Sequence, residues 1–422
     1  MNILIKKITF FKITFILVLV CIMIMYILCA STFIERTWIG YKFYNALIDY
    51  KYGILRRGFE GQVLRFIFPS HVSTFWYIKF STVLVYVSLI LLLVHFCIIY
   101  FRKFELSLLL LMVYFITSPA TFKNYFHELG RQDIFGFIFL LLIALLVCLK
   151  LNSIAKISLI LAVPLFCLTA ENHLFLFIPL SIYISCVNWN TKLTYFNINN
   201  TSFSQAWLIY LLLFVYLISF TFPFILPLPT VPIEQLKSYI ITRASDPQIL
   251  GWKTSDTPLP YLYHDTFYII SRVLHFLRYE VDWISVLPGW LMPILLTLIL
   301  NCLVAKIIPD RIVKYNYILG SILVSLALLP LFITGLDYGR WLSAYFVNIT
   351  FLSLYVLGNC DYTIDSKYYN YLNYYLISVS VAQLFINEPL GTIYSKVEIF
   401  KTVHTILINA FSSLYQIGKI TN

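Results

Sequence analysis

The sequence predicts an all-α fold, a polytopic bundle of transmembrane helices with about 11 spans, within a range of about 10 to 12. Hydrophobic residues make up 60% of the 422 positions, whereas charged residues make up only 12%. A soluble domain carries about 25% charged residues, so this chain has too few to cover a normal water-facing surface. Apolar runs long enough to cross a hydrocarbon core of about 30 Å recur along nearly the whole length. We therefore treat residues 1–422 as a single integral membrane domain.

The predicted spans follow one another with two long interruptions. They are expected near residues 10–31, 81–101, 105–120, 133–150, 156–170, 174–187, 206–227, 284–306, 316–335, 341–358 and 372–387. The first run follows three lysines and exceeds the apolar length of about 7–15 residues typical of a signal peptide, so we expect it to remain as a span. Most later spans are separated by short gaps such as 102–104 and 151–155. The stretch 396–416 is amphipathic, and it either lies on the membrane or makes a twelfth crossing.

A cytoplasmic N-terminus would make the two longest gaps, 32–80 and 228–283, periplasmic loops. Nearly all short gaps on the opposite side then carry Lys or Arg, as the positive-inside rule expects, although more of the basic residues lie outside. The dense clusters of mixed charge occur in four different gaps, and all four face outward in this orientation. We attribute the net charge of +11 primarily to basic residues that anchor the loops at the membrane, rather than to a nucleic-acid partner.

The first outward loop carries Asp49, Arg56, Arg57, Glu60 and Arg65. Arginine is suited to bidentate binding of phosphate, and the neighbouring glycines would let backbone approach a ligand closely. On a helix, Glu60 could instead pair with one of the two adjacent arginines, which would leave the loop as an interfacial anchor. Adjacent arginines in an outward loop oppose the positive-inside trend, so we favour substrate binding.

Two further outward gaps combine acids with bases. Glu128 and Arg131, before the fourth span, could pair across one helical turn, while Asp133 suits the positive N-terminal end of that span. The tight turn between the fifth and sixth spans holds Glu171 and His173. A solvated turn explains these two groups nearly as well as a proton-transfer pair does.

The last outward cluster contains Asp337 and Arg340, which follow the ninth span and are flanked by glycines. They either line a cavity or pair with each other. The loop 228–283 is rich in proline near its start and in aromatic residues throughout, without a specific motif. We expect it to form a lid or a re-entrant helical hairpin over a cavity. Ionisable groups at membrane depth are costly and usually mark a functional site, so these clusters are the candidate site.

The motifs that are missing narrow the class of enzyme. GxxxxGK[ST], GxGxxG, HExxH and GxSxG do not occur, so nucleotide-dependent, zinc-protease and serine-hydrolase chemistry lose their usual support. A DxD signature is missing too, and the eight cysteines form no CxxC pair, so we expect no metal and no cofactor. The remaining enzyme class uses an activated, lipid-borne donor with phosphate as the leaving group.

The whole layout resembles Wzy-type O-antigen or capsular polysaccharide polymerases, within the wider group of multi-span GT-C-like glycosyltransferases. The resemblance rests on length, span number, a composition rich in Ile, Tyr, Phe, Asn and Lys, one extended periplasmic loop and arginines in outward loops. It implies an enzyme that joins undecaprenyl-pyrophosphate-linked oligosaccharide repeat units on the periplasmic face of the bacterial inner membrane. Lipopolysaccharide or capsule would be the product, and a chain-length regulator a protein partner.

In that reaction a sugar hydroxyl attacks an anomeric carbon and pyrophosphate leaves. The base would be Asp49, which is similar to a carboxylate that the GT-C group uses in its first outward loop, or Glu128. The pyrophosphate would be held by Arg56, Arg57, Arg131 and Arg340. The other candidate substrate-binding residues are Glu60, Arg65, Asp133, Glu171, His173 and Asp337.

Two alternatives stay open. A GT-C transferase could add a single sugar from a polyprenyl-phosphate donor with the same fold. A transporter or flippase of lipid-linked saccharide would favour polar residues in broken helices at mid-membrane and a repeat between the two halves of the chain. Here the charges gather at one face and no repeat is visible, so we favour an enzyme.

Overall fold

The computed structural model describes residues 39–52, 58–103, 105–127, 132–169, 172–187, 203–225, 229–246, 262–264, 266–279, 283–334, 338–360 and 366–384. These residues form helices, with no β-strand among them, which confirms the all-α prediction. The expected span 10–31 and the amphipathic stretch 396–416 lie outside the described residues.

The helices follow the chain in the order of their labels. They are α2 (Ile39–Ala46), α3 (Gly58–Ile67), α4 (Thr74–Arg102), α5 (Leu106–Thr117), α6 (Phe122–His127), α7 (Asp133–Cys148), α8 (Asn152–Thr169), α9 (His173–Leu176), α10 (Ile178–Cys186), α11 (Phe203–Ile225), α12 (Ile233–Arg243), α14 (Thr266–Tyr279), α15 (Trp283–Ile307), α16 (Arg311–Thr334), α17 (Tyr338–Asn359) and α18 (Ser366–Leu384).

Three of the described helices are long and apolar enough to cross a membrane. They are Thr74–Arg102, Arg311–Phe332 and Arg340–Asn359. Five shorter apolar helices accompany them, at Leu106–Thr117, Asp133–Cys148, Asn152–Phe166, Ala206–Ser219 and Leu291–Ile307. The chain is therefore a helical protein with membrane-compatible helices, and the larger number of spans stays a prediction.

Two helix boundaries differ from the sequence-based expectation. Helix α4 begins at Thr74 rather than near residue 81, because the Ser73 hydroxyl accepts a hydrogen bond from the Phe75 amide and caps the helix there. The expected span 174–187 is broken into α9 and α10 at Phe177, where the backbone leaves helical geometry. Pro179 lies at the start of α10, and its missing amide proton cannot continue the preceding helix.

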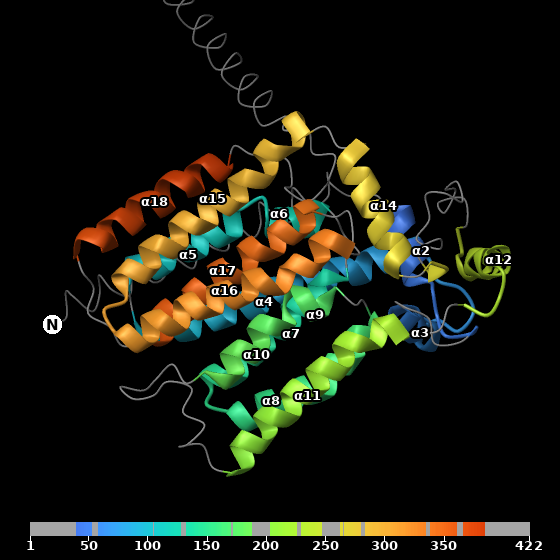
Figure 1. The fold of residues 1–422 in the computed structure, drawn as a ribbon, viewed down its shortest axis with the longest axis horizontal. Coiled ribbons are helices and arrows are strands. Elements are labelled where there is room, and N and C mark those ends of the chain that lie inside the picture. Colours follow the sequence, from blue (N-terminus) through green and yellow to red (C-terminus); the bar gives the residue numbers. More distant parts are fainter. Residues whose placement is uncertain are drawn as a thin grey trace, which may run out of the picture.

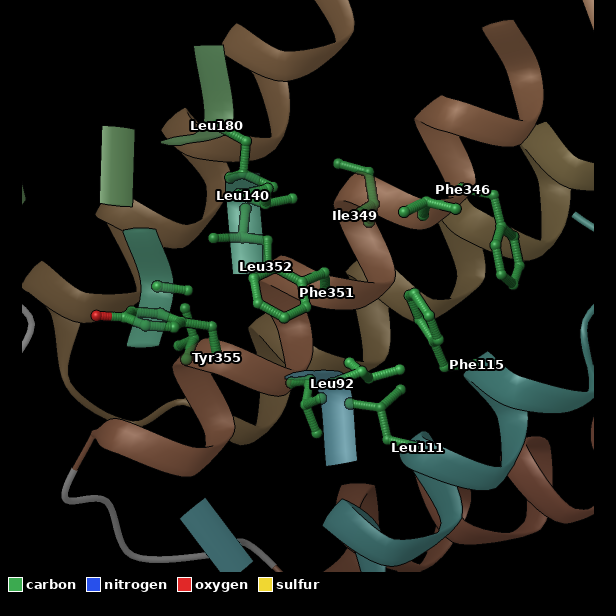
Figure 2. Packing of buried hydrophobic residues seen from close by; sticks show 14 of the residues in the cluster. Leu92, Leu111, Phe115, Leu140, Leu180, Phe346, Ile349, Phe351, Leu352 and Tyr355 are labelled. Atoms are coloured by element: carbon green, nitrogen blue, oxygen red, sulfur yellow. The ribbon is translucent and has the colours of Figure 1, made fainter. Parts of the chain in front are cut away.

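The long helices lie side by side along the length of the molecule (Figure 1). Helix α17 lies among them and packs against α4, α5, α15 and α16, while α7 packs against α4, α8 and α10. Apolar side chains from α4, α5, α7, α10 and α17 interlock in the central core, as Figure 2 shows for Leu92, Phe115, Leu140, Leu180 and Phe351. Dispersion between closely packed side chains stabilises this interior.

A smaller assembly of α2, α3, α12 and the start of α4, which we call the cap, occupies one end of the bundle (Figure 1). Its separate apolar cluster includes Phe43, Leu64, Tyr77, Leu236 and Ile240. The cap contains described parts of both long loops, 32–80 and 228–283, so segments far apart in sequence share one core. Helix α14 belongs to the second loop and packs against α16.

Candidate functional site

Asp49 lies inside the cap, directly after α2, with a fully buried side chain. Its Oδ2 accepts hydrogen bonds from the Tyr239 hydroxyl and from Nη1 of Arg243, each at 2.6 Å. Its Oδ1 accepts a hydrogen bond from the Lys51 amide at 2.9 Å. Both carboxylate oxygens are therefore engaged, which is the condition under which a buried charge is tolerated.

Backbone pairing holds Arg243 in position at the end of α12. The Val72 amide donates to the Arg243 carbonyl at 2.8 Å, and the Ser245 amide donates to the Val72 carbonyl at 3.0 Å. The resulting bridge between Val72 and Ala244 ties the α3–α4 connection to the segment after α12. The Arg243 side chain is only 4% exposed, so its contact with Asp49 is a buried ion pair.

Among the residues that the structure describes, several basic side chains gather near Asp49. Nη1 of Arg65 lies 3.7 Å from Oδ2 of Asp49, and the Arg65 side chain is 40% exposed. Nζ of Lys51 lies 4.1 Å from the centre of the Tyr239 ring, within cation–π range. In the described part of the chain, Arg65 and Arg243 thus lie at the Asp49 carboxylate and Lys51 lies over the ring of Tyr239, whose hydroxyl binds Asp49, an arrangement that attracts anions. We call Asp49, Lys51, Arg65, Tyr239 and Arg243 the Asp49 cluster.

Glu60 lies on α3 and reaches the bundle rather than the Asp49 cluster. Its side chain is buried, and its Oε2 accepts a hydrogen bond from Nε2 of Gln132 at 2.6 Å. Burial raises the pKa of Glu60 to about 7, an effect that the hydrogen bond from Gln132 partly opposes. The partner expected from the sequence, Arg56 or Arg57, lies outside the described residues.

Gly61 lets α3 lie close to the end of α2. A Cβ atom at this position would come within 1.9 Å of the Ile48 carbonyl oxygen, a distance that no side chain can occupy. Asp49 follows Ile48, and Glu60 precedes Gly61 on α3. The close approach therefore brings Asp49 near the helix that carries Glu60. The sequence suggested that glycines here would let backbone approach a ligand; at Gly61 the close partner is the Ile48 backbone, and the expected ligand contact stays a prediction.

Asp133 and Arg340 form an ion pair between the first turns of α7 and α17. Nε and Nη2 of Arg340 each donate to a different oxygen of Asp133, which is the bidentate arrangement. The position of Asp133 in the first turn of α7 agrees with its expected place at the positive end of that helix. The carboxylate of Asp133 thus supplies a partner for Arg340 that is distant in sequence, and Gln132 connects this pair to Glu60.

His173 begins α9 and is fully buried, so the solvated-turn interpretation is wrong for this residue. Its ring lies edge-on to Phe166 with 5.2 Å between ring centres. Gly136 of α7 faces it, and a Cβ atom there would lie 2.7 Å from Nδ1 of His173. The His173 ring therefore packs between α7 and α8. A side chain larger than glycine at position 136 would collide with it.

Apart from His173, which packs separately against Phe166 and Gly136, the described candidates come together in two groups at one end of the bundle. Asp49 and Arg65 meet in the first group, while Glu60, Asp133 and Arg340 are linked through Gln132 in the second. Helix α3 carries a member of each group. The remaining candidates, Arg56, Arg57, Glu128, Arg131, Glu171 and Asp337, lie outside the described residues.

Sequence reasoning missed Arg243, Tyr239 and Gln132. A signal was available for Arg243, because Leu236, Ile240 and Arg243 recur at helical spacing and all three are buried. An arginine on the apolar face of a helix needs a buried acceptor, and Asp49 provides it. Gln132 had no comparable signal, because its partner Glu60 is 72 residues away.

Within the described part of the chain, no group of three or more His, Cys, Asp or Glu side chains is placed to hold a metal ion. Comparison with family models, with curated proteins and with solved structures finds no match to this chain.

Proposed function

We propose that this chain is a membrane glycosyltransferase that polymerises undecaprenyl-pyrophosphate-linked oligosaccharide repeat units at an extracytoplasmic face. In a bacterium this is the periplasmic face of the inner membrane, with a cytoplasmic N-terminus. The observation that carries the proposal is the gathering of arginines and buried carboxylates, from both long loops and from the starts of α7 and α17, at one end of an apolar helical bundle. Ionisable groups near a membrane usually mark a functional site.

The reaction needs a base and a concentration of positive charge. A hydroxyl of one repeat unit attacks the anomeric carbon of another, the bond from that carbon to the pyrophosphate oxygen breaks, and the hydroxyl proton passes to the base. Guanidinium groups stabilise the negative charge that develops on the departing pyrophosphate. Arg65 and Arg243 are the described arginines of the Asp49 cluster, and Arg56, Arg57 and Arg131 are proposed to assist them.

Glu60 suits the role of base among the described carboxylates. A general base works best when its pKa lies near the operating pH, and burial brings the pKa of Glu60 to about 7. Asp49 already accepts hydrogen bonds on both oxygens, so the geometry favours it as the residue that positions Arg243. The sequence-based proposals of a base role for Asp49 and Glu128 stay predictions.

The test is to delete the gene in its source organism and to identify the lipid-linked intermediate that accumulates. Loss of a polymerase leaves complete single repeat units on the lipid, at the outer face, with no polymer. Complementation with the wild-type chain should restore the polymer, and the Glu60→Gln chain should not.

Other outcomes would replace the proposal. A truncated repeat unit in the deletion strain would indicate a single-sugar transferase. Complete units confined to the inner face would indicate a flippase, and an unchanged glycan profile would remove the function altogether.

A further inference from the structure

We propose that Arg243 is the anchor of a buried anion site that receives a phosphate or pyrophosphate group through Nε and Nη2 of its guanidinium. The choice of phosphate as the anion rests on the proposed function, whereas the site itself rests on the geometry of Arg243. No motif in the sequence points to a role for this residue.

Of the three guanidinium nitrogens of Arg243, one is engaged and two are open. Nη1 donates to Asp49, whereas Nε and Nη2 are buried and find no hydrogen-bond partner among the residues that the structure describes. Leaving a buried donor unsatisfied costs about 1–3 kcal/mol, and more for a charged group. Two adjacent open donors on one buried cation therefore call for an acceptor.

Arg340 shows what that edge of a guanidinium binds in this protein. Nε and Nη2 of Arg340 hold the two oxygens of the Asp133 carboxylate. The same two nitrogens are the open ones in Arg243, and together they form a planar fork that matches two oxygens of an oxyanion. The open fork of Arg243 thus has the geometry for a carboxylate or a phosphate.

The surrounding charge favours phosphate over a carboxylate. Lys51 and Arg65 stand beside the Asp49–Arg243 pair, so among the described residues three cations accompany the Asp49 carboxylate. Of the other described acids on or next to α12, Glu234 lies 3.9 Å from Lys237, and Oδ1 of Asp246 accepts from the Thr74 amide at 3.2 Å rather than from Arg243. A phosphate group, which carries up to two charges, would neutralise the excess that a single carboxylate leaves.

Asp49 acts in this site as a positioning residue. Its Oδ2 holds Nη1 of Arg243, and the Tyr239 hydroxyl donates to the same oxygen, so the guanidinium plane is fixed before the anion arrives. Preorganisation of this kind lowers the cost of binding. Because the open fork is buried, entry of the anion requires a shift of neighbouring side chains, and the half-exposed Arg65 is the solvent-facing member of the cluster.

The experiment measures anion binding by the full chain in nanodiscs, with no glycosyl transfer required. One arm titrates inorganic pyrophosphate into nanodiscs of neutral lipid, and a second arm incorporates undecaprenyl phosphate without free phosphate. Thermal unfolding reports binding, because a ligand that binds only the folded state raises the midpoint, increasingly so as its concentration exceeds its dissociation constant. The two arms separate a free phosphate ligand from a lipid headgroup.

We expect at least one probe to raise the unfolding midpoint of the wild-type chain, and Arg243→Lys to bind that probe at least about tenfold more weakly, because lysine lacks the planar fork. Arg278→Lys is the matched control, since Arg278 is an exposed arginine on α14 that lies 5.1 Å from the Tyr279 ring centre. Its affinity should equal that of the wild-type chain. If Arg243→Lys does not fold, Asp49→Asn combined with Arg243→Gln removes both buried charges together and is held to the same criterion.

Glucuronate, a carboxylate, is titrated in the same way for comparison. Three results would overturn the site: no response of the wild-type chain to either phosphate probe, equal affinity in the Arg243 variant, or a response to glucuronate equal to the response to the phosphate probe. The last result would assign the fork to a carboxylate. A chain that binds pyrophosphate through Arg243 but leaves the glycan profile unchanged on deletion would refute the proposed function and keep the site. If the wild-type chain polymerises glycan but Arg243→Lys binds phosphate as the wild-type chain does, the site is refuted and the proposed function is kept.

Discussion

Replacement of Glu60 by glutamine should stabilise the protein at alkaline pH while it abolishes activity. Glutamine keeps the shape of the side chain and still accepts the hydrogen bond from Gln132, but it carries no charge to bury. In the wild-type chain, burial raises the pKa of Glu60 from 4.5 to about 7. The folded state therefore holds the proton more tightly than the unfolded state does.

The sign and size of the effect follow from this shift. Below pH 4.5 the carboxyl group is protonated in both states and costs nothing, whereas above pH 7 it is ionised in both states and the folded state bears the burial cost. Each pKa unit corresponds to about 1.4 kcal/mol, so the wild-type chain loses up to about 3 kcal/mol of stability as the pH rises through this window. Glu60→Gln should avoid that loss, with little difference from wild type at pH 4.5 and a gain approaching about 3 kcal/mol at pH 8.

Denaturant unfolding in detergent micelles at several pH values measures the difference, together with glycan synthesis by the same preparations. Turnover by Glu60→Gln should fall by about 10² or more if Glu60 is the base. A variant that is more stable and less active cannot owe its lost activity to misfolding. Glu234→Gln is the control, because Glu234 is 69% exposed and should leave the pH profile unchanged. Parallel pH profiles for Glu60→Gln and wild type would refute the reasoning about burial.

Three further predictions concern the assembly of the site. Gly61→Ala should destabilise the cap by about 3 kcal/mol, because the added methyl group would lie 1.9 Å from the Ile48 carbonyl oxygen. Arg340→Lys should lower the free energy of unfolding by about 2 kcal/mol, because lysine cannot satisfy both oxygens of Asp133 at once. Ser70→Cys, placed at an exposed position before α4 in a chain without other cysteines, should react with an impermeant maleimide in intact cells, because we expect this end of the bundle to face outward.

Matched variants separate these effects from general damage. Gln62→Ala, one position beyond Gly61, should change stability little, and Arg311→Lys should be neutral because Arg311 is exposed at the start of α16. Equal stability of Gly61→Ala and Gln62→Ala would argue against the close approach of α3 to α2. For the topology, a cysteine at Thr191 that reacts in intact cells would reverse the proposed orientation.

The class of fold and most of the long helices could be predicted from the sequence, because apolar composition and run length are local properties. The runs near 81–101, 316–335 and 341–358 correspond to the three long apolar helices of the structure. Helix ends were less predictable. The start of α4 depends on one hydrogen bond to the Ser73 hydroxyl, and the break at Phe177 depends on the backbone geometry before Pro179.

The chemistry-bearing residues were partly recognisable for a similar reason. Charged clusters such as those that contain Asp49 and Arg65, Asp133, and Arg340 stand out against an apolar background because a membrane protein keeps few such groups. Their type and density are visible in the chain, and so is their common expected face. Their partners are not visible, because a charge near the membrane can be neutralised by any segment that folds back to it.

Only the tertiary structure decided those partners. Asp49 binds Arg243 across 194 residues, and Asp133 binds Arg340 across 207 residues. Neither pairing follows from local spacing, because each depends on how the cap and the bundle pack, and packing is set by the sum of many apolar contacts. Sequence by itself determined that a helical membrane-type bundle would carry a charged end; the packing of α3 and α12 onto that end determined which arginine keeps an open fork beside a buried carboxylate.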